Sequence, residues 1–131
     1  MKIVILKFGG TSVGSIEKIK KVAEIIEEYK KKNYKIIVVS SAMSGVTNEL
    51  IKKSKGISKN FSDAEYDVLV SSGEQVACSL IAGRLIHKGF KSRTWSAWQI
   101  PILTEGPHKN SKIHLINKKK ISDYLREGGI P

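Results

Sequence analysis

The segment Lys7–Ser12 (KFGGTS) combines a cation, two glycines and two hydroxyl side chains directly after an apolar stretch. Glycines allow a phosphate to approach the backbone closely, and the N–H groups at the start of a helix carry a partial positive charge. The segment is not a Walker A loop, because its lysine precedes the glycines, and its glycine spacing differs from the dinucleotide-binding fingerprint. By spacing alone, it fits either a phosphate-binding turn with Lys7 as its cation or a tight turn that only connects a strand to a helix.

Small and hydroxyl-bearing residues follow a second apolar stretch, in the segment Ser40–Asn48 (SSAMSGVTN). The carboxyl ends of parallel strands meet at one edge of a sheet, where open α/β sheets bind ligands. We therefore expect this segment and the first turn to lie on the same edge. Its hydroxyl groups could hydrogen-bond a small polar ligand, but Ser44 or Thr47 could equally cap the helix that follows.

The segment Ser71–Glu74 (SSGE) interrupts an otherwise apolar helical pattern. A glycine in a helix interior costs about 1 kcal/mol relative to alanine, so Gly73 requires a reason. Either the helix packs closely against a neighbour at this point, or the small residues leave room for Glu74 to reach a site. The apolar neighbours Val70 and Val76 favour partial burial of Glu74.

The remaining reactive residue types form no recognisable site. The three histidines lack metal-ligand spacing, and with a single cysteine the chain cannot form a zinc site, so we expect no metal ligands. Cys78 lies among apolar residues and is interpreted as a core thiol. Trp95 and Trp98 are also expected to pack in the core, on extended chain.

A strand, a helix and a second strand must position the first two segments. Ile3–Phe8 and Ile36–Val39 are apolar runs rich in β-branched residues, which is typical of buried strands. Between them, apolar residues at helical spacing and glutamate–lysine pairs four residues apart predict a helix over Ser15–Lys32. This order predicts a βαβ unit with parallel strands and a right-handed crossover.

Further elements follow from the same periodicities, and a capping-box pattern at Ser62–Glu65 marks one helix start. We expect helices over Val46–Lys53, Ser62–His87 and Lys118–Glu127, extended chain over Ser92–Trp98 and Ile100–Leu103, and a strand over Lys112–Ile116. Ile130–Pro131 is expected to open another strand, because an apolar residue after the glycine pair that stops a helix commonly does so. The chain therefore resembles a fragment whose sheet is not yet complete.

Composition narrows the class of protein. The chain has 131 residues, of which 40% are hydrophobic, and a formal net charge of +11. These values are typical of one globular domain and exclude a wholly disordered chain. No apolar run reaches the roughly 20 residues of a membrane span, and no signal peptide is recognisable. With one cysteine and no export signal, we expect a cytoplasmic protein. The positive charge allows nucleic acid or phosphorylated small molecules as partners, or lysines that only solvate the outer faces of helices.

Taken together, the segments Lys7–Ser12, Ser41–Asn48 and Ser71–Glu74, followed by Gly128–Pro131, resemble the aspartate kinases of the amino-acid kinase superfamily. The resemblance covers essentially the whole chain but only the first part of the family's catalytic domain. It implies a three-layer α/β/α sandwich with a mainly parallel sheet. It also implies transfer of the γ-phosphoryl group of MgATP to the side-chain carboxylate of L-aspartate, which gives 4-phospho-L-aspartate on the route to lysine, threonine and methionine.

The same resemblance implies roles for individual residues. Lys7 would be the catalytic cation that neutralises phosphate oxygens during transfer, and Thr47 and Glu74 would hold aspartate, with Glu74 pairing with the α-ammonium group. No residue of this chain is implied as a metal ligand, and magnesium is expected with ATP as the substrate complex; in the family, acidic and hydroxyl residues near the metal come from a later stretch of the domain. The residues implied to bind the ATP phosphates are Lys7, Gly9, Gly10, Thr11 and Ser12.

Residues 1–131 are accordingly expected to form the N-terminal portion of an aspartate kinase catalytic domain, without a regulatory ACT domain and inactive alone. Family resemblance places the arginine for the substrate α-carboxylate and most of the adenine pocket later in the domain. The expected partners are ATP and L-aspartate, with no nucleic acid and no membrane, and a homo-oligomer in the full-length enzyme. Two alternatives remain: a glutamate, acetylglutamate or uridylate kinase of the same superfamily, or a small basic nucleic-acid-binding module.

Overall fold

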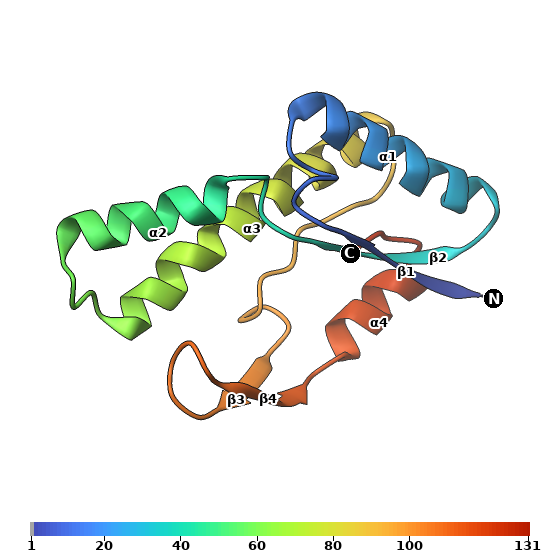
Figure 1. Cartoon of the computed structure of the whole chain (residues 1–131). Coiled ribbons are helices and arrows are strands. Elements are labelled where there is room, and N and C mark those ends of the chain that lie inside the picture. The colour runs from blue at the N-terminus through green and yellow to red at the C-terminus, as the bar shows by residue number, and fades with distance from the viewer. Residues whose placement is uncertain (1) are drawn as a thin grey trace.

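A computed structural model describes residues 2–131, and α/β elements account for most of them (Figure 1). In chain order the elements are β1 (Ile3–Phe8), α1 (Ile16–Lys31), β2 (Lys35–Ser40), α2 (Val46–Ile57), α3 (Asp63–His87), β3 (Ile102–Glu105), β4 (Lys112–Ile116) and α4 (Lys119–Arg126). Within residues 2–131, no helix is both long and apolar enough to cross a lipid bilayer.

The first three elements form the predicted βαβ unit. β1 and β2 pair in parallel, with Lys7 opposite Val39 and Phe8 opposite Ser40. α1 begins after Ser15, whose hydroxyl accepts a hydrogen bond from the backbone N–H of Lys18 at 3.3 Å. This bond satisfies one of the free N–H groups of the first helical turn, so the helix starts where the sequence predicts.

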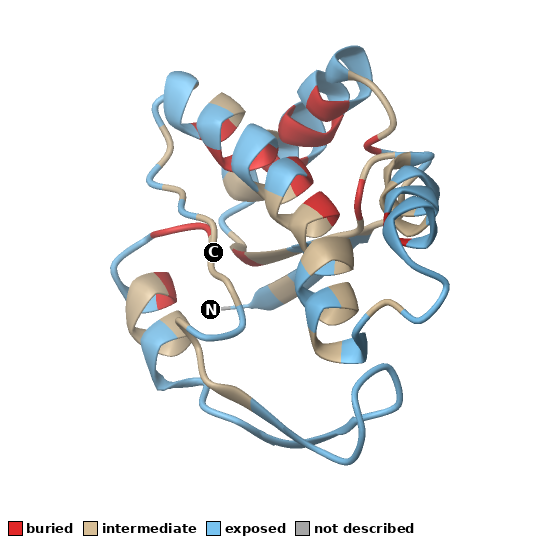
Figure 2. Ribbon diagram, turned by 90° about the vertical axis from the view of Figure 1, so that its left-hand side faces the viewer, coloured by how far each residue is buried: buried red, intermediate tan, exposed pale blue. Residues whose placement is uncertain are grey.

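The core lies between the β1–β2 sheet and two helices, α1 and α3, that pack on one of its faces (Figure 2). The apolar side of α1 contributes Ile26 to this core, β2 contributes Ile36 and α3 contributes Leu85. Each of these three side chains is at most 1% exposed. Burial on this scale stabilises by roughly 1.5–3 kcal/mol per large apolar side chain, so this layer holds the strands in place.

The opposite face of the β1–β2 sheet is covered in part by α4, which contacts β2, whereas the antiparallel β3–β4 pair lies farther from this sheet (Figure 1). Helices therefore lie on both sides of a parallel sheet, as the predicted three-layer arrangement requires. On β1 the cover is incomplete: Val4 and Leu6 pack against the core, whereas Ile3 and Ile5 are 61% and 63% exposed. The parallel pair thus has one buried face and one largely open face at β1.

The sheet continues beyond β2 through Ile130 and Pro131. The N–H of Val38 donates to the carbonyl of Pro131 at 2.9 Å, and the N–H of Ile130 donates to the carbonyl of Lys91 at 2.8 Å. Ser92 and Ile130 form a parallel bridge, and the Ile130 side chain is 1% exposed. The extended pairing predicted for Ile130–Pro131 is therefore present.

Some local expectations were wrong. α2 continues four residues past Lys53, to Ile57, and the hydroxyl of Ser62 makes no capping hydrogen bond at the start of α3. Residues 97–101 form turns instead of extended chain, with the N–H of Ile102 bonded to the carbonyl of Ala97 at 3.2 Å. This turn leaves Trp98 69% exposed, so Trp98 is not a core residue.

Candidate functional site

The ends of β1 and β2 bring two of the predicted segments to one edge of the sheet. The N–H of Ser41, the first residue after β2, donates to the carbonyl of Phe8, the last residue of β1, at 3.0 Å. Beyond this edge, α2 and the first half of α3 project away from the strands as an antiparallel pair (Figure 1). The segments after β1 and β2 therefore share the edge at which open α/β sheets bind ligands.

Residues 9–12 form a turn that leaves backbone donors free. The N–H of Ser12 donates to the carbonyl of Gly9 at 2.9 Å, while Gly9, Gly10 and Thr11 donate no backbone hydrogen bond within residues 2–131. The ammonium group of Lys18 binds the carbonyl of Thr11 at 2.9 Å. Free amides in a turn can form a site suited to an anion, and Ser12, whose N–H is already bonded, can contribute its exposed hydroxyl.

Lys18 was not singled out from the sequence. It lies in the first turns of α1 on a helix with many lysines, so its type and position carry no local signal. Only the folded turn shows that this ammonium group returns to Thr11 and holds the carbonyl side of the turn.

The two adjacent glycines of this turn have different structural reasons. A Cβ atom at Gly9 would meet no other atom within 4 Å, whereas one at Gly10 would lie 3.0 Å from the carbonyl oxygen of Ala42. Open space beside Gly9 is compatible with a ligand lying against the backbone. At Gly10, by contrast, the absence of a side chain permits close packing of two loops.

These two positions make a matched pair of variants. Gly10→Ala should lower the free energy of unfolding by about 1–3 kcal/mol, because the new methyl group forces the Ala42 carbonyl to move. Gly9→Ala should change it by less than about 1 kcal/mol, because the methyl group enters open space. Thermal or urea denaturation followed by circular dichroism measures both. Equal destabilisation by the two variants would contradict the assignment.

Lys7 occupies the carboxyl-terminal half of β1 and is exposed. Strand alternation puts it on the same face as Ile3 and Ile5, opposite the face that packs against α1 and α3. In the part of the chain that the structure describes, no acidic side chain forms an ion pair with Lys7. Its ammonium group is therefore available to an external anion.

Thr47 lies in the first turn of α2 and is half-buried. The N-cap of this helix is Gly45, which has a φ of 85°, and no side chain caps the helix. Capping was one of the two interpretations of the hydroxyl residues in this segment, and the structure does not adopt it. The Thr47 hydroxyl stays available for another role.

Glu74 is half-buried on α3, one residue after a close contact between α3 and the second segment. A Cβ atom at Gly73 would lie 3.0 Å from the Cβ of Ala42 and 3.2 Å from a methyl group of Val46. Close helix packing therefore accounts for Gly73. It also places the turn that carries Glu74 against the segment that carries Thr47, so the second and third segments meet.

Of two hollows that lie beside α3, one contains a predicted site residue. Glu74 and Ser71 line a hollow of about 490 Å³ between α3 and residues 94–98. The loop between β3 and β4 is attached to the same helix at the edge of this hollow, where His108 Nδ1 lies 2.6 Å from a carboxylate oxygen of the lining residue Asp67. Glu74 thus borders open space from which a small polar ligand could reach it.

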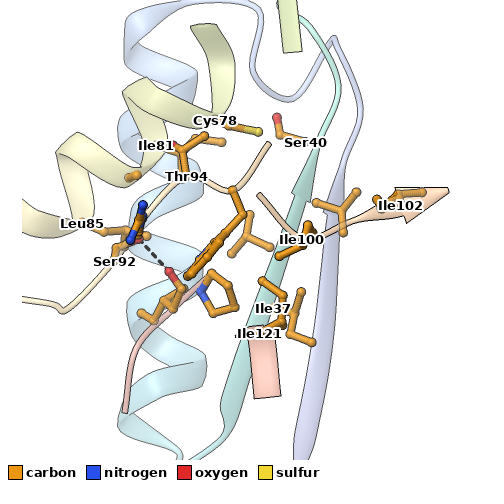
Figure 3. A pocket seen from close by; sticks show the side chains of 17 residues that line it. Ile37, Ser40, Cys78, Ile81, Leu85, Ser92, Thr94, Ile100, Ile102 and Ile121 are labelled. Carbon is orange, nitrogen blue, oxygen red and sulfur yellow. Dashed lines mark hydrogen bonds between the residues drawn. The ribbon is translucent and has the colours of Figure 1, made fainter. Parts of the chain in front are cut away.

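The second hollow, of about 330 Å³, is lined mainly by apolar side chains and lies beside β2 (Figure 3). Lys7, Thr47 and Glu74 do not line it. Its lining includes Ile37 of β2 and Ile121 of α4, together with Pro131. An apolar hollow of this kind is suited to apolar side chains.

Cys78 faces both hollows from α3 and is half-buried (Figure 3). Burial raises the pKa of the Cys78 thiol above its ordinary value, and the negative charge of Glu74 acts in the same direction; a hydrogen bond with the backbone of Ser40 opposes both. The thiolate, which is the nucleophile, is therefore less populated at neutral pH than in a free cysteine. This environment agrees with a structural thiol.

Alkylation kinetics test this environment. Iodoacetamide should react with Cys78 more slowly than with a cysteine peptide at pH 8, and the pH midpoint of the reaction should lie higher, because the folded-state pKa is raised. Unfolding in urea should restore the peptide rate. Faster reaction in the folded protein than in urea would contradict the assignment.

Comparisons with known proteins agree with this architecture. Residues 2–131 match the model of the amino acid kinase family. The chain is 44% identical to an aspartokinase of Rickettsia felis, over 100% of this chain and 33% of that protein, and 47% identical to an aspartokinase of Geobacillus stearothermophilus, over 99% and 32%. The chain thus spans about a third of the length of these relatives.

Solved structures give the same result for the fold. The aspartate kinase of Synechocystis superposes with a TM-score of 0.80 at 30% identity, over 98% of this chain and 21% of that one. Aspartokinase III of Escherichia coli, solved in complex with aspartate and ADP, also gives 0.80, at 19% identity over 99% of this chain and 40% of that one. The parallel βαβ unit, the α2–α3 pair and the α4 layer are therefore a recurring arrangement. The chain belongs to the amino acid kinase family, and the relatives that match it over 99–100% of its length include aspartokinases.

Proposed function

We propose that this chain provides one part of the active site of an aspartate kinase, which transfers the γ-phosphoryl group of MgATP to the side-chain carboxylate of L-aspartate to give 4-phospho-L-aspartate. Aspartokinase relatives along the whole chain support the family of reaction. The observation that carries the proposal is the turn of Gly9, Gly10 and Thr11, whose free amides lie at the same sheet edge as the Thr47 segment. In this proposal, residues 1–131 form the N-terminal portion of the catalytic domain.

The residues of the first segment suit the electrostatic demand of this reaction. A side-chain carboxylate is already ionised at neutral pH, so the acceptor needs no general base. The obstacle is the repulsion between two anions that must approach each other. Lys7 and the amides of Gly9 and Gly10 would offset it by holding phosphate oxygens, and magnesium would enter with ATP and neutralise further charge.

The residues of the second and third segments suit an amino acid. Glu74 would pair with the α-ammonium group of aspartate, and Thr47 would donate or accept a hydrogen bond beside it. Because these residues sit on α2 and α3, which pack directly on each other, the amino acid would be held in a fixed position relative to the turn at Gly9. Positioning of this kind lowers the barrier by converting an encounter into an intramolecular step.

The proposal has consequences for partners and location. ATP and aspartate are small molecules, so the excess of lysine would serve solubility and phosphate attraction, not binding of nucleic acid. We further propose a cytoplasmic enzyme that forms a homo-oligomer. We also expect residues 1–131 alone to lack turnover, because no group assigned here binds adenine or the substrate α-carboxylate.

Turnover of a complete version of the enzyme tests the proposal. With MgATP, aspartate should be phosphorylated at least about tenfold more efficiently than glutamate, because the extra methylene moves the acceptor carboxylate away from its position. The reaction is followed by ADP release and by trapping the acyl phosphate with hydroxylamine. A preference for glutamate, acetylglutamate or uridylate would assign another member of the family. Tight duplex binding with a steep salt dependence would favour a nucleic-acid-binding module.

A further inference from the structure

We propose that Ala42 is a positioning residue that sets the distance between two parts of the proposed site. These are the turn of residues 9–12, called the phosphate turn, and the turn of α3 that carries Glu74. This inference rests on the proposed function and concerns how the two halves of that site are held together. Ala42 lies between the strand end of β2 and the start of α2, and it is 4% exposed. It contacts both halves at once.

On one side, the backbone of Ala42 meets the phosphate turn. Its carbonyl oxygen lies 3.0 Å from the position that a Cβ atom would occupy at Gly10. A second contact follows along the same pair of loops, where a Cβ atom at Gly14 would lie 3.2 Å from the Cβ of Ser44. The turn after β1 therefore packs against the segment after β2 with no space for another methyl group.

On the other side, the methyl group of Ala42 meets α3. It lies 3.0 Å from the position that a Cβ atom would occupy at Gly73. This distance is shorter than an ordinary contact between carbon atoms, so the single methyl group of Ala42 fills the space between the two backbones. Glu74 is the next residue on a continuous helix of 25 residues, so its position follows any movement of α3 here.

Ala42 thus lies between the phosphate turn and α3 and contacts both. An added methyl group at Gly73 would move α3 or the Ala42 segment by a few tenths of an ångström. Such a shift separates Glu74 from the turn at Gly9 and Gly10 without removing any proposed binding group. Reactions that depend on the alignment of two bound substrates are sensitive to displacements of this size, whereas binding of one substrate alone is not.

Gly73→Ala in a complete version of the enzyme tests this role, with Gly83→Ala as the matched control. Both residues lie on α3, and a Cβ atom at Gly83 would meet nothing within 4 Å. Gly73→Ala should lower kcat/KM for aspartate by about tenfold. ADP affinity, measured by calorimetry, should change by less than about twofold, because the phosphate turn itself is intact. Gly83→Ala should leave kcat/KM and ADP affinity unchanged.

A compensating substitution makes the test specific for Ala42. Ala42→Gly removes the nearest atom that a new side chain at residue 73 would strike, while the methyl group of Val46 at 3.2 Å remains, so the double variant Gly73→Ala with Ala42→Gly should recover part of the lost kcat/KM. The melting temperature should follow the same pattern, with a loss in Gly73→Ala and recovery in the double variant. The melting temperature can be measured without enzymatic turnover, so it tests the contact between Ala42 and residue 73 even in an inactive variant.

The following outcomes would overturn the inference. If Gly73→Ala behaves like Gly83→Ala, or if Ala42→Gly restores neither kcat/KM nor the melting temperature, Ala42 does not set this distance. If Gly73→Ala weakens ADP binding as much as it lowers aspartate turnover, the substitution acts on the whole fold. Failure of the proposed function looks different, because the unaltered enzyme would then phosphorylate no aspartate.

Discussion

Replacing Lys7 by alanine should lower the kcat of a complete version of the enzyme by at least about 100-fold, which is typical when one group that stabilises developing charge is removed. The physical reason is the repulsion between the aspartate carboxylate and the transferred phosphoryl group. In residues 2–131, Lys7 forms no ion pair that could compete for its ammonium group, so its full charge can act on phosphate oxygens. Steady-state measurement of ADP release gives the change.

The fold should not suffer from this substitution. Lys7 is exposed, and an alanine there keeps the strand hydrogen bonds, so the free energy of unfolding should change by less than about 0.5 kcal/mol. Lys35→Ala is the matched control, because Lys35 lies on β2 opposite Ile3, at the other end of the same strand pair. It should keep full turnover. A Lys7→Ala enzyme with near-normal kcat would rule out the proposed catalytic role.

Replacing Glu74 by glutamine should raise the KM for aspartate by roughly 10- to 100-fold, since a hydrogen bond between charged groups contributes about 1.5–3 kcal/mol. Glutamine keeps the shape of the side chain but loses the charge that would attract the α-ammonium group. The KM for ATP should stay within about twofold, because the phosphate turn lies on other elements. Initial-rate measurements with each substrate varied in turn separate the two constants.

Glu65→Gln provides the control for this variant. Glu65 lies on α3 as Glu74 does, but in the exposed first turn of the helix, away from the hollow that Glu74 lines. Its replacement should leave both KM values unchanged. If Glu74→Gln left the aspartate KM at its original value, Glu74 would have no contact with the ammonium group and the hollow beside it would need another occupant.

The βαβ unit could be predicted from the sequence because its signals are local. The apolar run of Ile3–Phe8 forms a strand, and helical spacing from Ile16 onward forms α1, nearly to the residue. The parallel pairing then follows, since a strand, a helix and a second buried strand leave little choice of connection. The shared edge of the segments after β1 and β2 follows in turn from parallel strands.

Two local predictions failed at positions where the sequence pattern permits more than one local structure. Ser62 matches the capping-box pattern and precedes α3, but its hydroxyl makes no capping hydrogen bond with the helix. Trp98 was expected on extended chain, but the turn at residues 97–101 leaves it mostly exposed. In both cases residue types alone did not select between the local conformations that the sequence permits.

The candidate site also combines features that the sequence predicts with features that only the tertiary structure shows. From residue types alone, the sequence determined that a lysine, a glycine turn, a threonine and a glutamate stand at the ends of particular elements. Only the tertiary structure decided that Gly9 borders open space, that Gly10 and Gly73 both close on Ala42, and that Lys18 holds the carbonyl of Thr11. The physical reason is that periodicity and propensity act over a few neighbouring residues, whereas the spacing between two packed backbones is set by atoms that are far apart along the chain.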